Sequence, residues 1–231
     1  MNRQKVTSAI LQLTDDLLIS KGSIRACYKH PQDNSRCVKV YRQLSDLPRA
    51  SLAKTVRILL GSRFDRFNIN VQEYRFWLSL YDNDEISSIL HSYIPVMDGI
   101  VQSNLGVALV EEMFMDADGE PSKTLLQLKG ELTSDQLLLI QNDLRVITDC
   151  VIKHAIPMYD WNPTNILIVR DKNRCDVKIP DLEGEMANKE LIKISRWCIS
   201  ARRRKLHRRI ERFFARLNIE IVAQSRQEMT P

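Results

Sequence analysis

Long apolar runs are missing from this sequence of 231 residues. No stretch approaches the roughly eighteen consecutive apolar residues that a membrane-spanning helix needs. The first twenty residues contain Asp15 and Asp16 and have no continuous apolar core, so we expect neither a signal peptide nor a membrane span. The hydrophobic fraction of 44% is nevertheless enough to build a buried core in one medium domain or two small lobes.

Cysteine is also sparse, and the sequence has no Cys-x-x-Cys pair. An odd number of cysteines without such a pair does not suggest a disulfide framework. Each one stands among apolar or strand-like neighbours, which predicts reduced core thiols and a cytoplasmic protein. The five are Cys27, Cys37, Cys150, Cys175 and Cys198.

Basic charge is concentrated in one segment near the C-terminus. Residues 189–216 contain eleven Lys or Arg and two Glu, a net charge of +9, whereas the whole chain carries +5 and the remainder therefore −4. Three interpretations stay open: a docked helix with a solvated basic face, a contact with an anionic surface such as phospholipid or lipid A phosphate, or a contact with RNA or DNA. No interleaved aromatic residues favour specific nucleic-acid binding. The apolar positions with helical spacing are Leu206, Ile210, Phe213, Phe214 and Leu217.

The N-terminal region has the pattern of a small β-sheet. Residues 16–41 have the pattern of three short antiparallel strands, joined by a tight turn at Gly22 and a polar turn at 32–35. Lys39 falls among apolar neighbours on one face of the third strand. Such a lysine needs an anionic partner, because burying an unpaired charge is costly. An exposed strand lysine with an apolar stem is the alternative.

Helices and further strands follow this region. The apolar spacing predicts one helix over 51–60, ending at Gly61, and a second from about 71 to 81. Strand-like runs at 94–101 and 106–110 bring the expected number of strands to five, accompanied by a helix. This combination matches a small nucleotide-binding lobe.

Glu73 in the second predicted helix is the natural anionic partner for Lys39. A local role competes with this pairing, because Asn70 followed by Glu73 also resembles an N-terminal capping pair.

Residues 115–122 are polar and contain glycine and proline, so we expect the hinge between two lobes there. This divides the chain into a nucleotide-binding lobe over 1–113 and a catalytic lobe over 114–231. Glu112 and Met113, directly before the hinge, are expected to contact nucleotide. The ligand spacing of a calcium-binding EF-hand loop is absent.

A short helix is expected over 122–130, followed by a longer one. Thr133 with Gln136 predicts a capping box at the start of the long helix. Its buried face is predicted to contain Leu137, Ile140, Leu144, Ile147 and Val151.

After the long helix, Asp160 and Asn165 stand five positions apart, with Pro163 preventing helix continuation. Asp-x-x-x-x-Asn followed by Ile-Leu-Ile is the arrangement of kinase catalytic loops, where the Asp orients or deprotonates a hydroxyl and the Asn holds magnesium. An ordinary turn is the alternative, because Asp and Asn often bond their own backbone. A hairpin over 166–179 would bring Asp181 near Asn165.

These residues occur in the order that a kinase fold requires. Lys39 would neutralise nucleotide phosphates while Glu73 fixes it. Asn165 and Asp181 would hold Mg²⁺, and Asp160 would receive the acceptor proton. The expected activity is Mg²⁺-dependent transfer of the terminal phosphoryl group of ATP to a hydroxyl.

Four motifs spread over most of the chain resemble those of a known family: Arg25-Ala-Cys-Tyr-Lys-His-Pro, Cys37-Val-Lys-Val, Asp116-Ala-Asp-Gly-Glu-Pro-Ser-Lys-Thr-Leu and Asp160-Trp-Asn-Pro-Thr-Asn-Ile. With them the chain resembles the bacterial kinase-like YrbL family, named from the PhoP regulatory network. The resemblance implies an α+β, two-lobed protein-kinase-like fold in the bacterial cytoplasm, with a small β-rich N-terminal lobe and a mostly helical, truncated C-terminal lobe. More distantly, Asp-x-x-x-x-Asn with Asp181-Leu-Glu is similar to aminoglycoside and lipopolysaccharide-sugar kinases.

The chain departs from protein kinases in three ways. The His-Arg that usually precedes the catalytic Asp is Met158-Tyr159, and the glycine-rich loop is reduced to Gly22. Only fifty residues follow Asp181, too few for the large substrate platform. An anionic small molecule or envelope sugar is therefore favoured over a protein as acceptor. A non-catalytic kinase-like interaction protein, a pseudokinase, is the alternative function.

Overall fold

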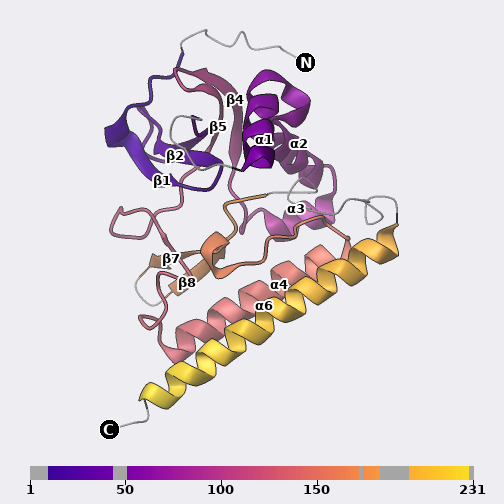
Figure 1. Cartoon of the computed structure of the whole chain (residues 1–231). Helices are drawn as coiled ribbons and strands as arrows, with labels where there is room; N and C mark the ends of the chain where they lie inside the picture. The colour runs from indigo at the N-terminus through magenta and orange to yellow at the C-terminus, as the bar shows by residue number, and fades with distance from the viewer. Residues whose placement is uncertain (1–9, 44–50, 172–173, 183–197, 229–231) are drawn as a thin grey trace. The chain divides into compact units, whose positions relative to one another are not determined.

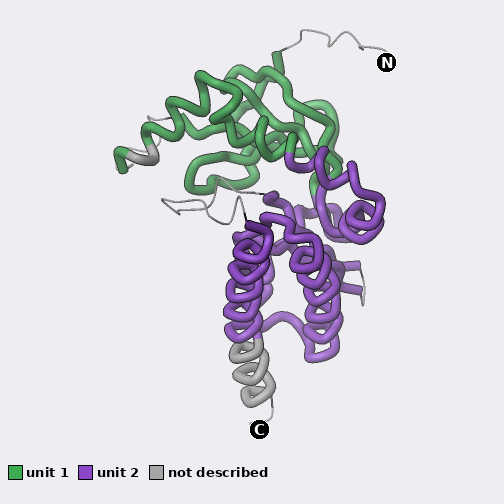
Figure 2. Tube along the Cα trace, turned by 90° about the vertical axis from the view of Figure 1, so that its right-hand side faces the viewer, with its two compact units in different colours: residues 1–75, 96–113 green, residues 76–95, 114–231 purple. Residues whose placement is uncertain are grey.

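The computed structural model describes residues 10–43, 51–171, 174–182 and 198–228 (Figure 1). The chain folds into two compact units (Figure 2). The first unit comprises residues 1–75 and 96–113, and the second comprises residues 76–95 and 114–231. The functions expected for residues 1–113 and 114–231 stay predictions.

Five antiparallel strands form the sheet of the first unit: β1 (Leu18–Lys21), β2 (Arg25–Lys29), β3 (Arg36–Tyr41), β4 (Met97–Ser103) and β5 (Gly106–Glu112). Their order is β1-β2-β3-β5-β4. The three strands expected over 16–41 are therefore present, preceded by a short 3₁₀ turn at Asp15–Leu17.

The two faces of this sheet differ. One face packs in an apolar core that includes Tyr28, Val38, Val40 and Val110. Because side chains alternate along a strand, Lys39 points to the other face, where Cys27 and Leu109 are its cross-strand neighbours. This alternation places a charged residue beneath helix α2 (Ile69–Tyr81) rather than in the apolar core.

Helix α1 (Leu52–Arg63) continues past Gly61, where we expected it to end. The glycine serves packing instead, because a Cβ atom at this position would lie 2.7 Å from Cζ of Tyr41. The Tyr41 hydroxyl passes through that space and accepts a hydrogen bond from the backbone amide of Ile69 at 2.7 Å. Tyr41 thereby anchors the start of α2.

The start of α2 also corrects the expected capping pair. Oδ1 of Asn68 accepts hydrogen bonds from the amides of Asn70 at 2.9 Å and Val71 at 3.4 Å, so Asn68 provides the cap. Asn70 lies inside the helix, and its Nδ2 donates to the carbonyl oxygens of Lys39 at 2.9 Å and Val107 at 3.1 Å. The capping role considered for Asn70 with Glu73 is wrong.

The second unit is built around α4 (Ser134–Lys153), which begins with the expected capping box of Thr133 and Gln136. All five residues predicted for its inner face are buried. A three-stranded sheet with order β6-β7-β8 accompanies the helix, and α3 (Asp84–Leu90) precedes it in the chain. The strands are β6 (Lys123–Thr124), β7 (Leu167–Asp171) and β8 (Arg174–Lys178).

The segment expected to be the hinge lies inside the second unit, because the chain passes from one unit to the other between Met113 and Phe114. The carboxylate of Asp116 holds this segment as a turn. It accepts hydrogen bonds from the Arg170 amide at 3.1 Å, from Arg170 Nε at 2.8 Å and from the Ser122 hydroxyl at 2.8 Å. The short helix expected over 122–130 is absent, because residues 123–124 pair with β7 as strand β6 and residues 125–130 form turns.

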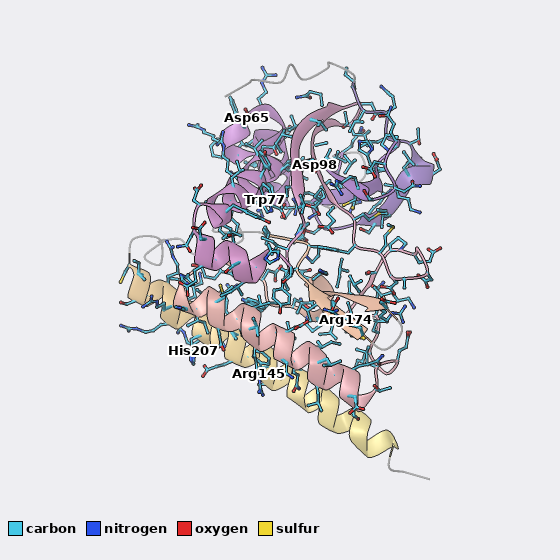
Figure 3. All side chains as sticks on the ribbon, turned by 180° about the vertical axis from the view of Figure 1, so that it is seen from behind. Asp65, Trp77, Asp98, Arg145, Arg174 and His207 are labelled. Atoms are coloured by element: carbon cyan, nitrogen blue, oxygen red, sulfur yellow. The ribbon has the colours of Figure 1, made fainter. Side chains whose placement is uncertain are left out.

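The C-terminal helix α6 (Ile199–Glu228) lies alongside α4 (Figures 1 and 3). Its apolar face is buried as expected, with Phe214 half-buried. Residues 189–197 of the basic segment lie outside the described residues. Within the ranges that the structure covers, no helix is both long and apolar enough to span a membrane.

Candidate functional site

A buried ionic cluster, formed by Arg25, Lys39, Glu73 and Glu111, lies on the charged face of the first unit's sheet. Nζ of Lys39 is 2.8 Å from Oε1 of Glu111 and 3.6 Å from Oε1 of Glu73. Nη1 of Arg25 pairs with Oε2 of Glu73. None of the four residues is more than 9% exposed. Two cations balance two carboxylates, as burial of charge requires.

The expected pairing of Lys39 with Glu73 is thus one contact in a larger cluster, and an exposed Lys39 is excluded. Sequence reasoning missed Glu111 and Arg25. Strand register contained a signal for both: Glu111 lies opposite Cys37, diagonal to Lys39, while Arg25 is two residues before the cross-strand neighbour of Lys39. Only the complete pairing of β2, β3 and β5 reveals these neighbours.

The remaining predicted nucleotide-binding positions have backbone partners within the first unit. Gly22 forms the turn between β1 and β2, and its amide donates to Arg25 O at 2.9 Å. The amide of Glu112 donates to Val96 O at 2.8 Å, and that of Met113 donates to Ser35 O at 2.9 Å. The nucleotide contacts of these three residues stay a prediction.

In the second unit, the Asp160 loop (residues 154–166) begins where α4 ends. Ala155 adopts a left-handed conformation with φ of 50°, and the amide of Ile156 donates back to Val151 O at 2.9 Å. This is the C-terminal cap that glycine usually forms, and an alanine there costs about 1–2 kcal/mol in backbone strain. The cap turns the chain sharply toward Asp160.

A short 3₁₀ turn, η4 (Pro163–Asn165), then closes the Asp160 loop. Oδ1 of Asn162 accepts from the Thr164 amide at 3.2 Å, and Pro163 occupies the first position of the turn. The turn returns Asn165 to Asp160, so that Nδ2 of Asn165 donates to Oδ2 of Asp160 at 2.6 Å. The alternative considered from the sequence was a loop side chain that only bonds its own backbone in a turn. Asn162 has this role, whereas the Asp160 carboxylate accepts from the Asn165 side chain.

Asp181 follows β8 and completes the group. The chain after β8 is fixed by the Ile179 amide, which donates to Tyr93 O at 2.7 Å. Asp160, Asn165 and Asp181 line one pocket of the second unit, together with Tyr159, Trp161 and apolar neighbours. The structure thus brings the three predicted catalytic and metal-binding residues together.

The oxygen atoms in this pocket fit Mg²⁺, which prefers oxygen ligands and usually takes one or two carboxylates together with substrate phosphates and water. Asn165 and Asp181 are the residues that would hold the ion. Among the described residues, no three His, Cys, Asp or Glu side chains group as a ready-made metal site. Such a pocket suits a metal ion that arrives with phosphate ligands.

Residues 11–218 match the family model described as PhoP regulatory network protein YrbL. The chain belongs to this family. Two curated YrbL relatives, each described as "Uncharacterized protein YrbL", come from Escherichia coli (strain K12) and Shigella flexneri. Each is 24% identical over 219 residues, which cover 93% of this chain and 91% of the relative.

The fold of this YrbL-family chain is similar to that of the Rio2 kinase from Chaetomium thermophilum, in a crystal structure of its ADP/Mg²⁺-phosphoaspartate complex. The TM-score is 0.53 at 16% sequence identity. The match covers 90% of this chain but 56% of the Rio2 chain, so the present chain spans a little over half of that kinase. The similarity confirms the predicted kinase-like α+β fold.

Proposed function

We propose that this YrbL-family protein is a Mg²⁺-dependent phosphotransferase that moves the terminal phosphoryl group of ATP to a hydroxyl. The grouping of Asp160, Asn165 and Asp181 around one pocket, in a chain with a kinase-like fold, carries the proposal. Phosphoryl transfer asks a protein mainly for positioning and electrostatic stabilisation, and little for covalent chemistry. The residues in and around the pocket supply groups of this kind.

Each residue has a distinct role in the proposal. Asp160 orients the acceptor hydroxyl and receives its proton. Asn165 and Asp181 would hold Mg²⁺, which would neutralise the charge of the nucleotide phosphates. In the first unit, Lys39 neutralises nucleotide phosphates, and Glu73 restricts the position of the lysine side chain.

An anionic acceptor, a phosphorylated or lipid-linked sugar, fits the exposed charge of α6. Four arginines recur every fourth position and therefore follow one side of the helix. In the part of the chain that the structure describes, none of them has an ion pair. Arginine suits phosphate because its planar guanidinium donates two hydrogen bonds at once. This arginine stripe consists of Arg204, Arg208, Arg212 and Arg216.

A location in the bacterial cytoplasm belongs to the same proposal. Its support is the bacterial source of the relatives and the free state of all five cysteines.

The decisive test compares ATP turnover by the wild type with that by Asp160→Asn, which keeps the size of the side chain and removes its basicity. Pooled anionic metabolites, envelope glycolipids and lysate serve as acceptors. One arm contains no added acceptor, because a kinase of similar fold is described with ADP/Mg²⁺ and a phosphoaspartate. Asp149→Asn, an exposed position on α4, is the matched control. Turnover by the wild type and the control but not by Asp160→Asn is expected.

Binding is measured separately by calorimetry with magnesium and ATP. Lys39→Met and Asp181→Ala should both weaken ATP binding, because each removes a charge assigned to the phosphates or their metal. Binding that neither substitution changes would place the nucleotide elsewhere and refute the assigned site.

A non-catalytic kinase-like interaction protein is the second candidate function. The observation that favours it is the pairing of Lys39 with Glu111, which engages the charge assigned to the nucleotide phosphates. Under this alternative, wild type and Asp160→Asn show equal turnover in every acceptor pool while ATP still binds.

A further inference from the structure

Helix α6 contacts the residue on the N-terminal side of Asp160. The carbonyl oxygen of Tyr159 accepts a hydrogen bond from Nη1 of Arg209 at 2.7 Å. Nζ of Lys205 lies 4.4 Å from the centre of the Tyr159 ring, and Cζ of Arg209 lies 5.4 Å from it. Cations are attracted to aromatic faces most strongly where water is excluded, and both Tyr159 and Lys205 are buried. The backbone and the ring of Tyr159 are therefore both held by α6.

The same helix contacts the residue on the C-terminal side of Asp160. The ring centre of Trp161 lies 6.1 Å from that of Phe213, which is 3% exposed. Nε1 of Trp161 donates to the carbonyl oxygen of Met158 at 2.8 Å, so the indole also closes the loop on itself. Asp160 is exposed between two anchored neighbours.

These contacts come from one side of α6. Lys205, Arg209 and Phe213 are four residues apart, a spacing that stacks side chains along one helix face. Arg203 extends the contact to the end of α4, where its Nη2 donates to Lys153 O at 2.7 Å. The basic residues of α6 thus form two groups. The arginine stripe is exposed, whereas Arg203, Lys205 and Arg209 contact the backbone or a ring of the second unit.

We propose that Arg209, assisted by Lys205 and Phe213, is a positioning residue that fixes the Asp160 carboxylate in its pocket. The inference rests on the proposed function, because it assigns the support of the same loop. In the position of the His-Arg that precedes the catalytic Asp of protein kinases, this chain has Met158-Tyr159. Here a residue fifty positions away in the sequence provides the anchor instead. A fixed carboxylate matters because misplacing a catalytic group by about 1 Å costs roughly a hundredfold in rate.

The test uses the full chain and the variants Arg209→Gln, Arg209→Lys and Arg145→Gln. The last removes an exposed arginine from α4 (Figure 3) and serves as the charge-matched control. Backbone amide hydrogen exchange is followed by mass spectrometry. Arg209→Gln should accelerate exchange in residues 155–165 about tenfold, the effect of losing one hydrogen bond from a charged donor. Exchange in α4 should stay unchanged, Arg209→Lys should fall between Gln and wild type, and Arg145→Gln should match wild type.

Steady-state kinetics provides the second readout. Arg209→Gln should lower kcat about tenfold while leaving KM for ATP and the calorimetric affinity for magnesium and ATP unchanged, because only the acceptor-orienting group moves. Unchanged exchange in residues 155–165 would overturn the proposal, as would an equal increase along the whole of α4.

The two proposals fail in different ways. If the wild type shows no turnover, the phosphotransferase proposal fails, and the exchange measurement still decides whether Arg209 fixes the loop. If turnover is present and Arg209→Gln leaves both exchange and kcat unchanged, the positioning role fails and the phosphotransferase proposal stands.

Discussion

Nζ of Lys39 lies 2.8 Å from Oε1 of Glu111, closer than the 3.6 Å that separates it from Oε1 of Glu73. Glu111 is 1% exposed, so this pairing acts where water screens charge little. A nucleotide phosphate that binds Lys39 has to compete with the Glu111 carboxylate. Under the proposed function, this competition would set how tightly the protein binds ATP.

Glu111→Gln should strengthen ATP binding and weaken the fold. The ionic cluster would change from neutral to a charge of +1, and we expect about tenfold tighter ATP binding, equivalent to about 1.4 kcal/mol. Removing one partner of a buried ion pair should lower the free energy of unfolding by roughly 3 kcal/mol. Calorimetry and urea unfolding measure the two effects.

The control for this variant is Asp98→Asn, which breaks the exposed pair between Asp98 and Arg36 on the same sheet. It should change stability by less than about 1 kcal/mol and leave ATP affinity unaltered. Weaker ATP binding by Glu111→Gln would mean that Glu111 supports Lys39 instead of competing with phosphate.

Gly61→Ala should destabilise the first unit by about 1–3 kcal/mol, the usual cost of inserting a methyl group into a filled space. The added Cβ atom displaces the Tyr41 ring, and with it the hydroxyl that binds the Ile69 amide. Thermal unfolding measures the change. Ser62→Ala at the next, exposed position is the control and should be nearly neutral. Equal stability of the two variants would show that the Tyr41 contact is not needed.

Asp116 should make stability depend on pH in the acid range. Burial raises the pKa of its carboxyl, but hydrogen bonds from Arg170 and Ser122 outweigh burial and hold the pKa below its ordinary value. A carboxyl with a lowered pKa in the folded state stabilises the fold above its unfolded pKa of about 3.9. This contribution is lost as the pH falls through the lower folded value.

The measurement is urea unfolding at pH values between about 7 and about 3. Asp116→Asn should be less stable than wild type at neutral pH, and its stability should decrease less on acidification. Asp118→Asn in the same turn is the control, because Asp118 is exposed and its carboxylate accepts a hydrogen bond from the Glu120 amide. Parallel pH profiles for Asp116→Asn and wild type would contradict the assignment.

Alkylation of native protein should modify Cys198 first, because it is the exposed cysteine. Cys37 should react only after unfolding. A hydrogen bond with Cys27 and burial both raise the pKa of the Cys37 thiol well above its ordinary value, which leaves little reactive thiolate. Peptide mass spectrometry after iodoacetamide treatment measures the order. Comparable labelling of Cys37 and Cys198 in the native state would contradict it.

Much of the fold was predictable because its signals are local. The capping box of Thr133 and Gln136 and the inner face of α4 depend on spacings of three and four residues. Asp160 and Asn165 were identifiable for the same reason, since a single turn brings them together. The expectation of buried thiols holds for four of the five cysteines, which are buried or half-buried, and is wrong for Cys198.

The wrong or incomplete predictions concern features that depend on packing between segments far apart in the sequence. Gly61 does not end α1, because the position of Tyr41 requires a glycine there. Arg25 and Glu111 join Lys39 only through strand register, and Arg209 reaches Tyr159 only through helix packing. Helix α3 was missed although Asn83 caps it by accepting from the Ile86 amide at 3.1 Å, so a usable local signal existed.

Asn70 restrains the movement of helix α2, which limits how an activity could be regulated. Kinases are commonly controlled by the position of the helix that carries the glutamate partner of the lysine. Here Asn70 ties that helix to two strands through the carbonyl oxygens of Lys39 and Val107, and it accepts from Nη1 of Arg25 at 3.3 Å. Swinging the helix outward would break all three bonds of a side chain that is 0% exposed, at about 1–3 kcal/mol for each buried group left unsatisfied. Control by helix displacement is therefore disfavoured, and we expect this protein to be governed by the supply of its ligands.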